Sequence, residues 1–137
     1  MLVSYAAEEK PVTHATMIVK DAPDRVVCER CHVADRAHAR LRGLLGRKTL
    51  PAGEGLLLRP SPSIHTWFMR FPIDAAFLDA DLRVLHVAAE LPPWRFAGRR
   101  GARAVLELAA GEARRQGIER GMALTLVTKE GEDHHEL

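Results

Sequence analysis

Short runs of apolar and β-branched residues recur along the chain, and several alternate with polar residues in the period of two that is typical of β-strands. Residues that favour turns, mainly aspartate, glycine and proline, separate these runs. Outside the centre of the chain, the pattern predicts six strands: 13–20, 25–34, 55–59, 83–91, 104–108 and 122–127. The intervening turn at 21–24 predicts that the first two strands form a hairpin.

The central stretch from Ile64 to Asp79 combines aromatic residues with ionisable side chains, which an ordinary core strand does not contain. It holds three of the four phenylalanines and one of the two tryptophans. Pro72 divides it into two predicted strands, because proline cannot donate a backbone hydrogen bond to a sheet. Alternation places four side chains of the first strand on one face: His65, Trp67, Met69 and Phe71.

The second half of this stretch is predicted to pair with the strand at 83–91 as a hairpin. Alternation there separates Asp74 from an apolar face that contains Ile73, Ala75 and Phe77. We expect Trp67 and Phe77 to be fully packed in the core.

Two segments have the pattern of short helices. Asp35 can cap a helix that runs to about residue 45, with leucines at spacings of three and four. Residues 111–116 are expected to form a second helix of one or two turns. Together with about seven strands, these helices predict an α+β, mainly β fold: a small, largely antiparallel, barrel-like or sandwich domain with two short helices.

The chain of 137 residues is long enough for one domain with its own core. We expect residues 1–12 to form a flexible arm, residues 13–128 the domain, and residues 129–137 a frayed tail. The first ten residues lack the pattern of a signal peptide, and no apolar stretch reaches the roughly 18 residues of a membrane-spanning helix. These features predict a cytoplasmic protein and leave its oligomeric state open.

Three ionisable residues interrupt predicted apolar strands: His65, Asp74 and Glu107. A buried polar group without a partner costs about 1–3 kcal/mol, so we expect each to have one. In an enzyme, His65 would act as general acid or base, oriented by Asp74 or Glu107, with an arginine stabilising negative charge. In a structural interpretation, His65 is a hydrogen-bonded core residue, and Asp74 accepts backbone N–H groups or pairs with an arginine.

Arginines form two groups along the sequence. If the register of the first predicted helix continues through its two glycines, Arg36, Arg40 and Arg47 fall on one side. Guanidinium groups there can bind a phosphate or carboxylate. The alternative is a solvated helix face. Combined with the central stretch, this stripe gives six candidates for ligand binding: Arg40, Arg47, His65, Met69, Arg70 and Asp74.

The second group of arginines lies in a predicted loop beside Trp94 and Phe96. It consists of Arg95, Arg99, Arg100 and Arg103. Arginine next to aromatic residues also occurs in proteins that bind single-stranded nucleic acid. A net charge of only +2 argues against nucleic acid as the partner.

Cys28, Cys31 and His32 match the C-x-x-C-H pattern of covalent haem attachment. The surrounding valines instead predict a strand, in which residues three apart point to opposite faces. A zinc site could be formed by these residues, or by the two cysteines with His38. Such a site would need a second pair of ligands, C-x-x-C or H-x-x-x-H, which the sequence does not contain. We therefore expect two reduced strand cysteines, no metal and no cofactor.

Four segments together resemble the DUF192 (UPF0127) family: 40–47, 65–79, 104–111 and 117–121. The most specific are Arg-Leu-Arg-Gly-Leu-Leu-Gly-Arg in the first and the aromatic run that leads into Pro-Ile-Asp-Ala-Ala-Phe-Leu-Asp in the second. The resemblance implies the fold of that family and marks candidate positions. It implies no reaction, because the family has no established biochemical activity.

From these features we expect a non-catalytic domain that binds a small anionic ligand or a protein partner. The sequence contains no nucleophile elbow, phosphate-binding loop, dinucleotide fingerprint or zinc-protease motif, so an enzyme is the less favoured interpretation. Two alternatives stay open: a small enzyme that uses His65, Asp74 and Glu107 with arginine, and a purely structural or assembly module.

Overall fold

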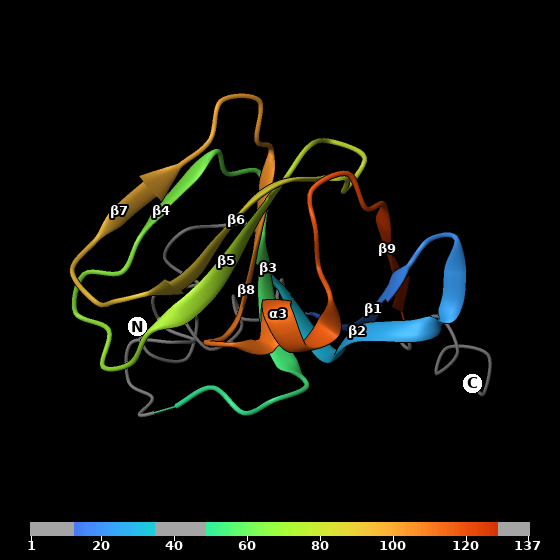
Figure 1. Cartoon of the computed structure of the whole chain (residues 1–137), viewed down its shortest axis with the longest axis horizontal. Coiled ribbons are helices and arrows are strands. Elements are labelled where there is room, and N and C mark those ends of the chain that lie inside the picture. Colours follow the sequence, from blue (N-terminus) through green and yellow to red (C-terminus); the bar gives the residue numbers. More distant parts are fainter. Residues whose placement is uncertain (1–12, 35–48, 129–137) are drawn as a thin grey trace, which may run out of the picture.

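The computed structural model describes residues 13–34 and 49–128, and within them the protein is mainly β, built on one seven-stranded sheet (Figure 1). Its strands follow one another in the spatial order β6 (Val84–Leu91), β5 (Ile73–Leu78), β8 (Ala104–Ala109), β3 (Glu54–Leu58), β2 (Ala22–Ala34), β1 (Thr13–Val19) and β9 (Leu124–Thr128). Strands β4 (Ser63–His65) and β7 (Phe96–Gly98) form a separate antiparallel ribbon.

The strands of the seven-stranded sheet fall close to the positions that the apolar pattern predicts, and both predicted hairpins are confirmed. β1 pairs with β2, and β5 with β6, in antiparallel fashion. β2 and β3 are parallel, so the sheet is mixed. Within the described residues there is one helix, α3 (Glu112–Gln116), which is the second of the two predicted; the predicted helix at 35–45 lies outside those residues.

The sheet is open, so the predicted barrel-like closure is wrong. Its edge strands β6 and β9 meet only where each begins, through an isolated bridge between Arg83 and Ala123. Backbone hydrogen bonds beside this bridge join Val84 N–H to Met122 O and Gly121 N–H to Val84 O, both at 2.8 Å. Beyond this point the two edges do not pair along their length, and a continuous ladder is what closure of a barrel requires.

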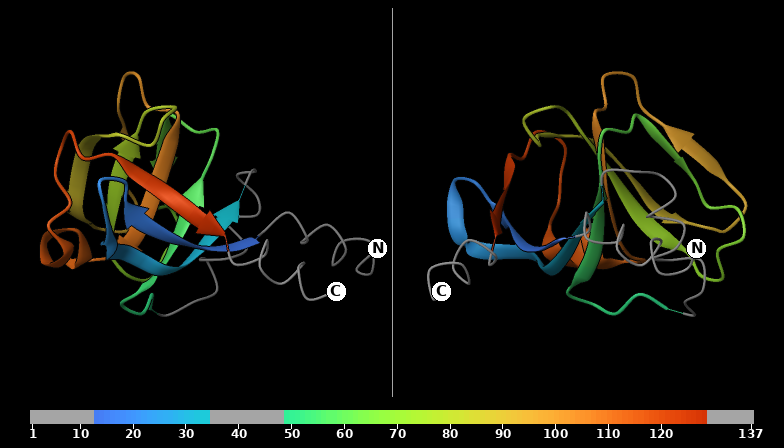
Figure 2. Two further views of the ribbon diagram at one scale, coloured as in Figure 1. Left: turned by 90° about the vertical axis from the view of Figure 1, so that its right-hand side faces the viewer. Right: turned by 180° about the vertical axis from the view of Figure 1, so that it is seen from behind.

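Both faces of the sheet are buried, which explains why its central strands are almost wholly apolar. The first core cluster covers one face and includes Leu57, Leu78 and Leu106, together with Ala113 of α3. The second cluster covers the other face, where the β4–β7 ribbon packs; it includes Ile64, Ile73, Phe77, Ala102 and Val105. The ribbon lies at the end of the molecule away from β1, β2 and β9 (Figure 2).

The chain between β4 and β5 departs from the predicted strand. β4 ends at His65, and Phe68 has φ 70°, a left-handed conformation that breaks the alternation of side chains. Before this turn, alternation continues from buried Ile64 to buried Thr66 and leaves Trp67 exposed, so the prediction that Trp67 is packed is wrong. After the turn, Met69 is buried. The predicted loop after Trp94 also contains a strand, β7.

The two cysteines lie on the same side of β2, although a regular strand would separate them. On β1, Ala15 pairs with Cys31 and Met17 pairs with Cys28, so three residue steps on β2 face two on β1. This β-bulge turns both thiols into the first core cluster. A hydrogen bond with the Cys31 thiol, together with burial, raises the pKa of the Cys28 thiol above its ordinary value.

Candidate functional site

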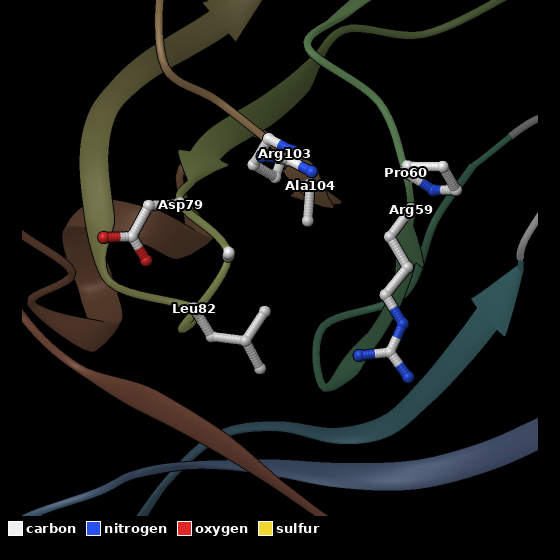
Figure 3. A pocket seen from close by; sticks show the side chains of 7 residues that line it. Arg59, Pro60, Asp79, Leu82, Arg103 and Ala104 are labelled. Carbon is white, nitrogen blue, oxygen red and sulfur yellow. The ribbon is translucent and has the colours of Figure 1, made fainter.

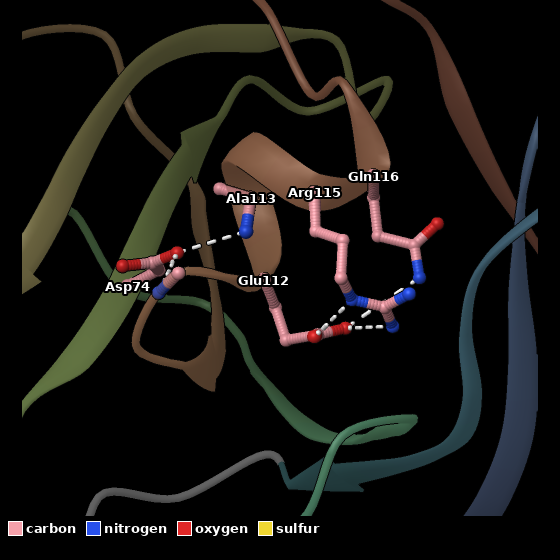
Figure 4. A network of polar contacts seen from close by, with 6 residues as sticks. Asp74, Glu112, Ala113, Arg115 and Gln116 are labelled. Carbon is pink, nitrogen blue, oxygen red and sulfur yellow. Dashed lines mark hydrogen bonds and ion pairs between the residues drawn. The ribbon is translucent and has the colours of Figure 1, made fainter.

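Asp74, the first candidate of the central stretch, is a buried carboxylate that accepts backbone hydrogen bonds. Its Oδ1 accepts from the N–H of Glu90 at 2.7 Å, and its Oδ2 accepts from Gly111 at 3.0 Å and Ala113 at 2.8 Å. A bulge in β6 directs Glu90, with φ 51°, toward this carboxylate. Asp74 thus joins β5, the end of β6 and the start of α3, and Figure 4 shows its contact with Ala113 of α3.

Beside this junction, Glu112 and Arg115 form an ion pair on α3. Arg115 Nε donates to Glu112 Oε2 at 2.7 Å, and its Nη2 donates to Oε1 at 2.9 Å (Figure 4). The hydrogen bond from Arg115 lowers the pKa of the Glu112 carboxyl. Arg115 therefore serves the helix itself, and the Asp74 carboxylate is held by backbone N–H groups.

Glu107 is also buried, but on the other face of the sheet. Alternation along β8 places it on the side of Val105 and the second core cluster, opposite Leu56 of β3 and Ala75 of β5. Asp74 lies on the side of the first cluster. The sheet therefore separates these two candidate catalytic carboxylates.

The other candidates occupy different environments. His65 is half-buried, and its ring stacks on Trp67 with 4.6 Å between ring centroids. Met69 is a core residue of the second cluster, whereas Arg70 is exposed. Arg40 and Arg47 lie outside the described residues.

Four large aromatic side chains gather around the end of the β4–β7 ribbon, and we call them the aromatic surface. They come from the turn after β4 and from the chain that leads into β7, and their exposed fractions are 47% for Trp67, 63% for Phe68, 57% for Trp94 and 68% for Phe96. Phe68 and Trp94 contact each other with ring centroids 4.7 Å apart. Most exposed apolar residues of a domain are scattered singly, so a cluster of four is unusual.

The backbone beneath this surface is strained. Phe68 and Trp94 have φ angles of 70° and 68°, in the left-handed region that bulky residues rarely adopt. Such a residue costs on the order of 1–3 kcal/mol and persists only where its surroundings impose the conformation. Here the two strained residues are the two whose rings touch across the turns.

Thr66 imposes this arrangement by joining the two turns. Its carbonyl accepts from the N–H of Trp94 at 2.9 Å, and its own N–H donates to the carbonyl of Arg95 at 2.8 Å. Its hydroxyl donates to the carbonyl of Pro92 at 2.7 Å and accepts from the N–H of Arg95 at 2.9 Å. Thr66 is fully buried. Nothing in the sequence marks Thr66 as a site residue, because its partners lie about 26–29 positions away and form no local pattern.

Replacing Thr66 by valine, which has the same shape, removes both hydroxyl contacts. We expect a loss of about 1–3 kcal/mol in the free energy of unfolding, because the Pro92 carbonyl and the Arg95 N–H lose a buried partner. Thr66→Ser keeps the hydroxyl and is expected to stay within about 1 kcal/mol of the parent protein. Urea unfolding of both variants measures the difference; equal losses would mean that the hydroxyl contributes nothing.

The aromatic surface has a basic border. Residues 62–73 and 91–101 contain four arginines and no aspartate or glutamate, although the whole chain carries a net charge of only +2. All four arginines are exposed: Arg70, Arg95, Arg99 and Arg100. Apolar rings on two segments that carry arginines and no carboxylates favour an acidic binding partner.

The cysteines and histidine of the C-x-x-C-H pattern do not converge on one point. Both thiols lie in the core, while His32 is half-buried and its Nε2 lies 2.9 Å from Glu54 Oε2. Within residues 13–34 and 49–128, no group of three or more histidine, cysteine, aspartate or glutamate side chains is placed to hold a metal ion.

Comparison with protein families identifies the chain. The model of DUF192, a family described as uncharacterised, matches residues 18–126. The chain belongs to the DUF192 family. The resemblance seen in its sequence motifs is therefore confirmed.

Two solved structures resemble this DUF192 domain. A protein of unknown function from Novosphingobium aromaticivorans DSM 12444 is 26% identical, with a TM-score of 0.69 over 83% of this chain and 84% of that chain. A proposed transcription regulator from Sinorhizobium meliloti 1021 is 21% identical, with a TM-score of 0.70 over 84% of this chain and 93% of that chain. A search of curated proteins gave no match.

A membrane-spanning helix does not occur in the described part of the DUF192 domain, since no helix there is long and apolar enough to cross a bilayer.

Proposed function

We propose that this DUF192 domain is a non-catalytic binding domain whose aromatic surface takes an acidic segment of a protein partner. The observation that carries the proposal is the contact between Phe68 and Trp94, two exposed aromatic residues that are both held in the left-handed conformation. The fold keeps this strain at a surface where it brings no burial of the rings. Strain of this kind is concentrated at binding and catalytic sites.

The composition of the surface supports a protein partner. Tryptophan, phenylalanine and arginine are enriched at protein interfaces, where aromatic anchors in a desolvated centre supply most of the binding energy. The arginine border would attract an acidic segment from a distance and help fix its orientation. Thr66 holds the rings in place before binding, so little conformational entropy is lost when a partner arrives.

Three other interpretations fit these residues less well. A second copy of the chain, related by a two-fold axis, would place arginines opposite arginines. Nucleic acid would need aromatic faces free for base stacking, whereas Trp67 has a face covered by His65 and Phe68 leans on Trp94. The enzyme interpretation loses support because Asp74 is occupied by three backbone donors on the face opposite Glu107.

Tryptophan fluorescence gives a direct test, because the chain has two tryptophans and both lie on this surface. We expect acidic peptides with a leucine or phenylalanine anchor to shift the emission to shorter wavelength and to protect it from acrylamide quenching. Matched peptides with asparagine and glutamine should have no effect. The affinity should fall as salt is added, because exposed charges are screened.

The control compares two double variants with equal net charge. The variant with both Arg95→Gln and Arg99→Gln is expected to bind the acidic peptide at least about tenfold more weakly, a change of about 1.4 kcal/mol in binding free energy. Arg114→Gln with Arg120→Gln changes exposed arginines elsewhere and should leave the affinity unchanged. The proposal fails if no acidic peptide in a broad array alters the emission, or if an oligothymidine probe binds while the peptides do not.

A further inference from the structure

A second candidate site lies at the other end of β5, away from the aromatic surface. It is a pocket of about 350 Å³, lined by Arg59, Pro60, Asp79, Ala80, Leu82, Arg103 and Ala104. The strands β3 and β5 end here and β8 begins, since Leu58 pairs with Val105 and Leu78 with Ala104. The volume is at the lower end of the range for small-molecule sites.

The pocket carries opposite charges that do not pair with one another. Figure 3 shows Arg59 on one side and Asp79 on the other, with Arg103 between them and Leu82 below. Among the residues that the structure describes, no ion pair joins Asp79 to either arginine, and neither arginine has another carboxylate partner. Both guanidinium groups can therefore contact a ligand.

Backbone hydrogen bonds fix the segments of chain that carry these charged side chains. The N–H of Arg59 donates to Ala34 O at 3.1 Å, and that of Arg103 donates to Leu78 O at 2.7 Å. Asp79 Oδ1 accepts from the N–H groups of Asp81 and Arg83, each at 2.9 Å. These two contacts use one oxygen of the carboxylate and leave the other for a ligand.

We propose that this pocket binds a small zwitterion of the amino-acid class. A ligand carboxylate would lie between Arg59 and Arg103, whose planar forks match it. A ligand ammonium group would contact the second oxygen of Asp79. A simple anion such as phosphate satisfies the arginines but meets repulsion from Asp79, whereas a zwitterion satisfies both charges. Two positive groups and one negative group favour a ligand with one more negative than positive charge.

The test uses L-glutamate, with glutarate as the analogue that has both carboxylates and no ammonium group. In ¹H–¹⁵N correlation spectra we expect L-glutamate to shift the amides of residues 79–82 and 103–104 and to leave those of 94–96 unchanged. Glutarate and inorganic phosphate should bind at least about fivefold more weakly, as expected for loss of one charged hydrogen bond. Because the two sites are separate, failure of this test leaves the proposed function standing.

Variants test which charged side chains of the pocket contact the ligand. Arg59→Gln or Arg103→Gln is expected to lower the affinity for L-glutamate about tenfold. Asp79→Asn keeps the Oδ1 acceptor of the turn and should remove the preference for L-glutamate over glutarate; Asp81→Asn, an exposed neighbour, and Arg114→Gln should change nothing. The proposal is overturned if phosphate binds as tightly as L-glutamate, if Asp79→Asn keeps the preference, or if none of the three probes shifts the pocket amides.

Discussion

Replacing Asp74 by alanine is expected to lower the free energy of unfolding by about 3–5 kcal/mol, because three backbone N–H donors lose their acceptor and each loss of a buried partner costs about 1–3 kcal/mol. The donors come from Glu90, Gly111 and Ala113, so β6 and the start of α3 lose a common anchor. Water can reach the less buried donors, which keeps the sum below three full penalties. Urea unfolding followed by circular dichroism measures the change.

Asp74→Asn provides the matched control. Asparagine keeps one carbonyl acceptor of similar shape and replaces the other oxygen with a donor group that cannot accept a hydrogen bond. We expect the free energy of unfolding of Asp74→Asn to lie between those of the parent protein and Asp74→Ala. A melting temperature that stays level or rises in Asp74→Ala would contradict the structural role and return this carboxylate to the list of functional candidates.

Truncating Phe77 to alanine is expected to cost about 3–5 kcal/mol, the range for removing a large aromatic side chain from a packed core. Phe77 has no exposed surface and lies in the second core cluster, where it pairs with Val105 of β8. Denaturant unfolding and the melting temperature both report this loss.

Trp67→Ala is the comparison for Phe77→Ala. Trp67 is 47% exposed, so its removal is expected to cost less than about 1 kcal/mol, as for most surface substitutions. This differs from the expectation drawn from alternation, which placed both residues in the core. A large loss in Trp67→Ala together with a small one in Phe77→Ala would mean that the faces of the central stretch are reversed.

The strands of the seven-stranded sheet could be predicted from sequence because each has its own apolar pattern, and β5 shows this most clearly. Its alternation separates Asp74 from Ile73, Ala75 and Phe77, as the two core clusters confirm. The helix at 112–116 follows from its local sequence in the same way. The open edge between β6 and β9 could not be predicted, because closure depends on the relative placement of strands that are distant in sequence.

The aromatic surface was only partly predictable. Trp94 and Phe96 beside arginines are visible in the sequence as a candidate site, but alternation with Met69 and Phe71 predicts that Trp67 lies in the core. In the structure Ile64 and Thr66 face the core, so the same alternation directs Trp67 outward. The left-handed turn at Phe68 then returns Met69 and Phe71 to the core. The bulge that unites Cys28 and Cys31 is a similar case, since the pairing with β1 produces it.

The central claim, that the aromatic surface binds an acidic protein segment, is tested most directly by photocrosslinking in cells that produce the protein. A photoreactive phenylalanine analogue would replace Phe96 on the surface or, as a control, Val127, which is 42% exposed on β9. We expect position 96 to give a crosslinked partner whose attached peptide is rich in aspartate and glutamate, and Arg95→Gln with Arg99→Gln to abolish it. Equal crosslinking from position 127, or a crosslink that survives the loss of both arginines, would contradict the claim.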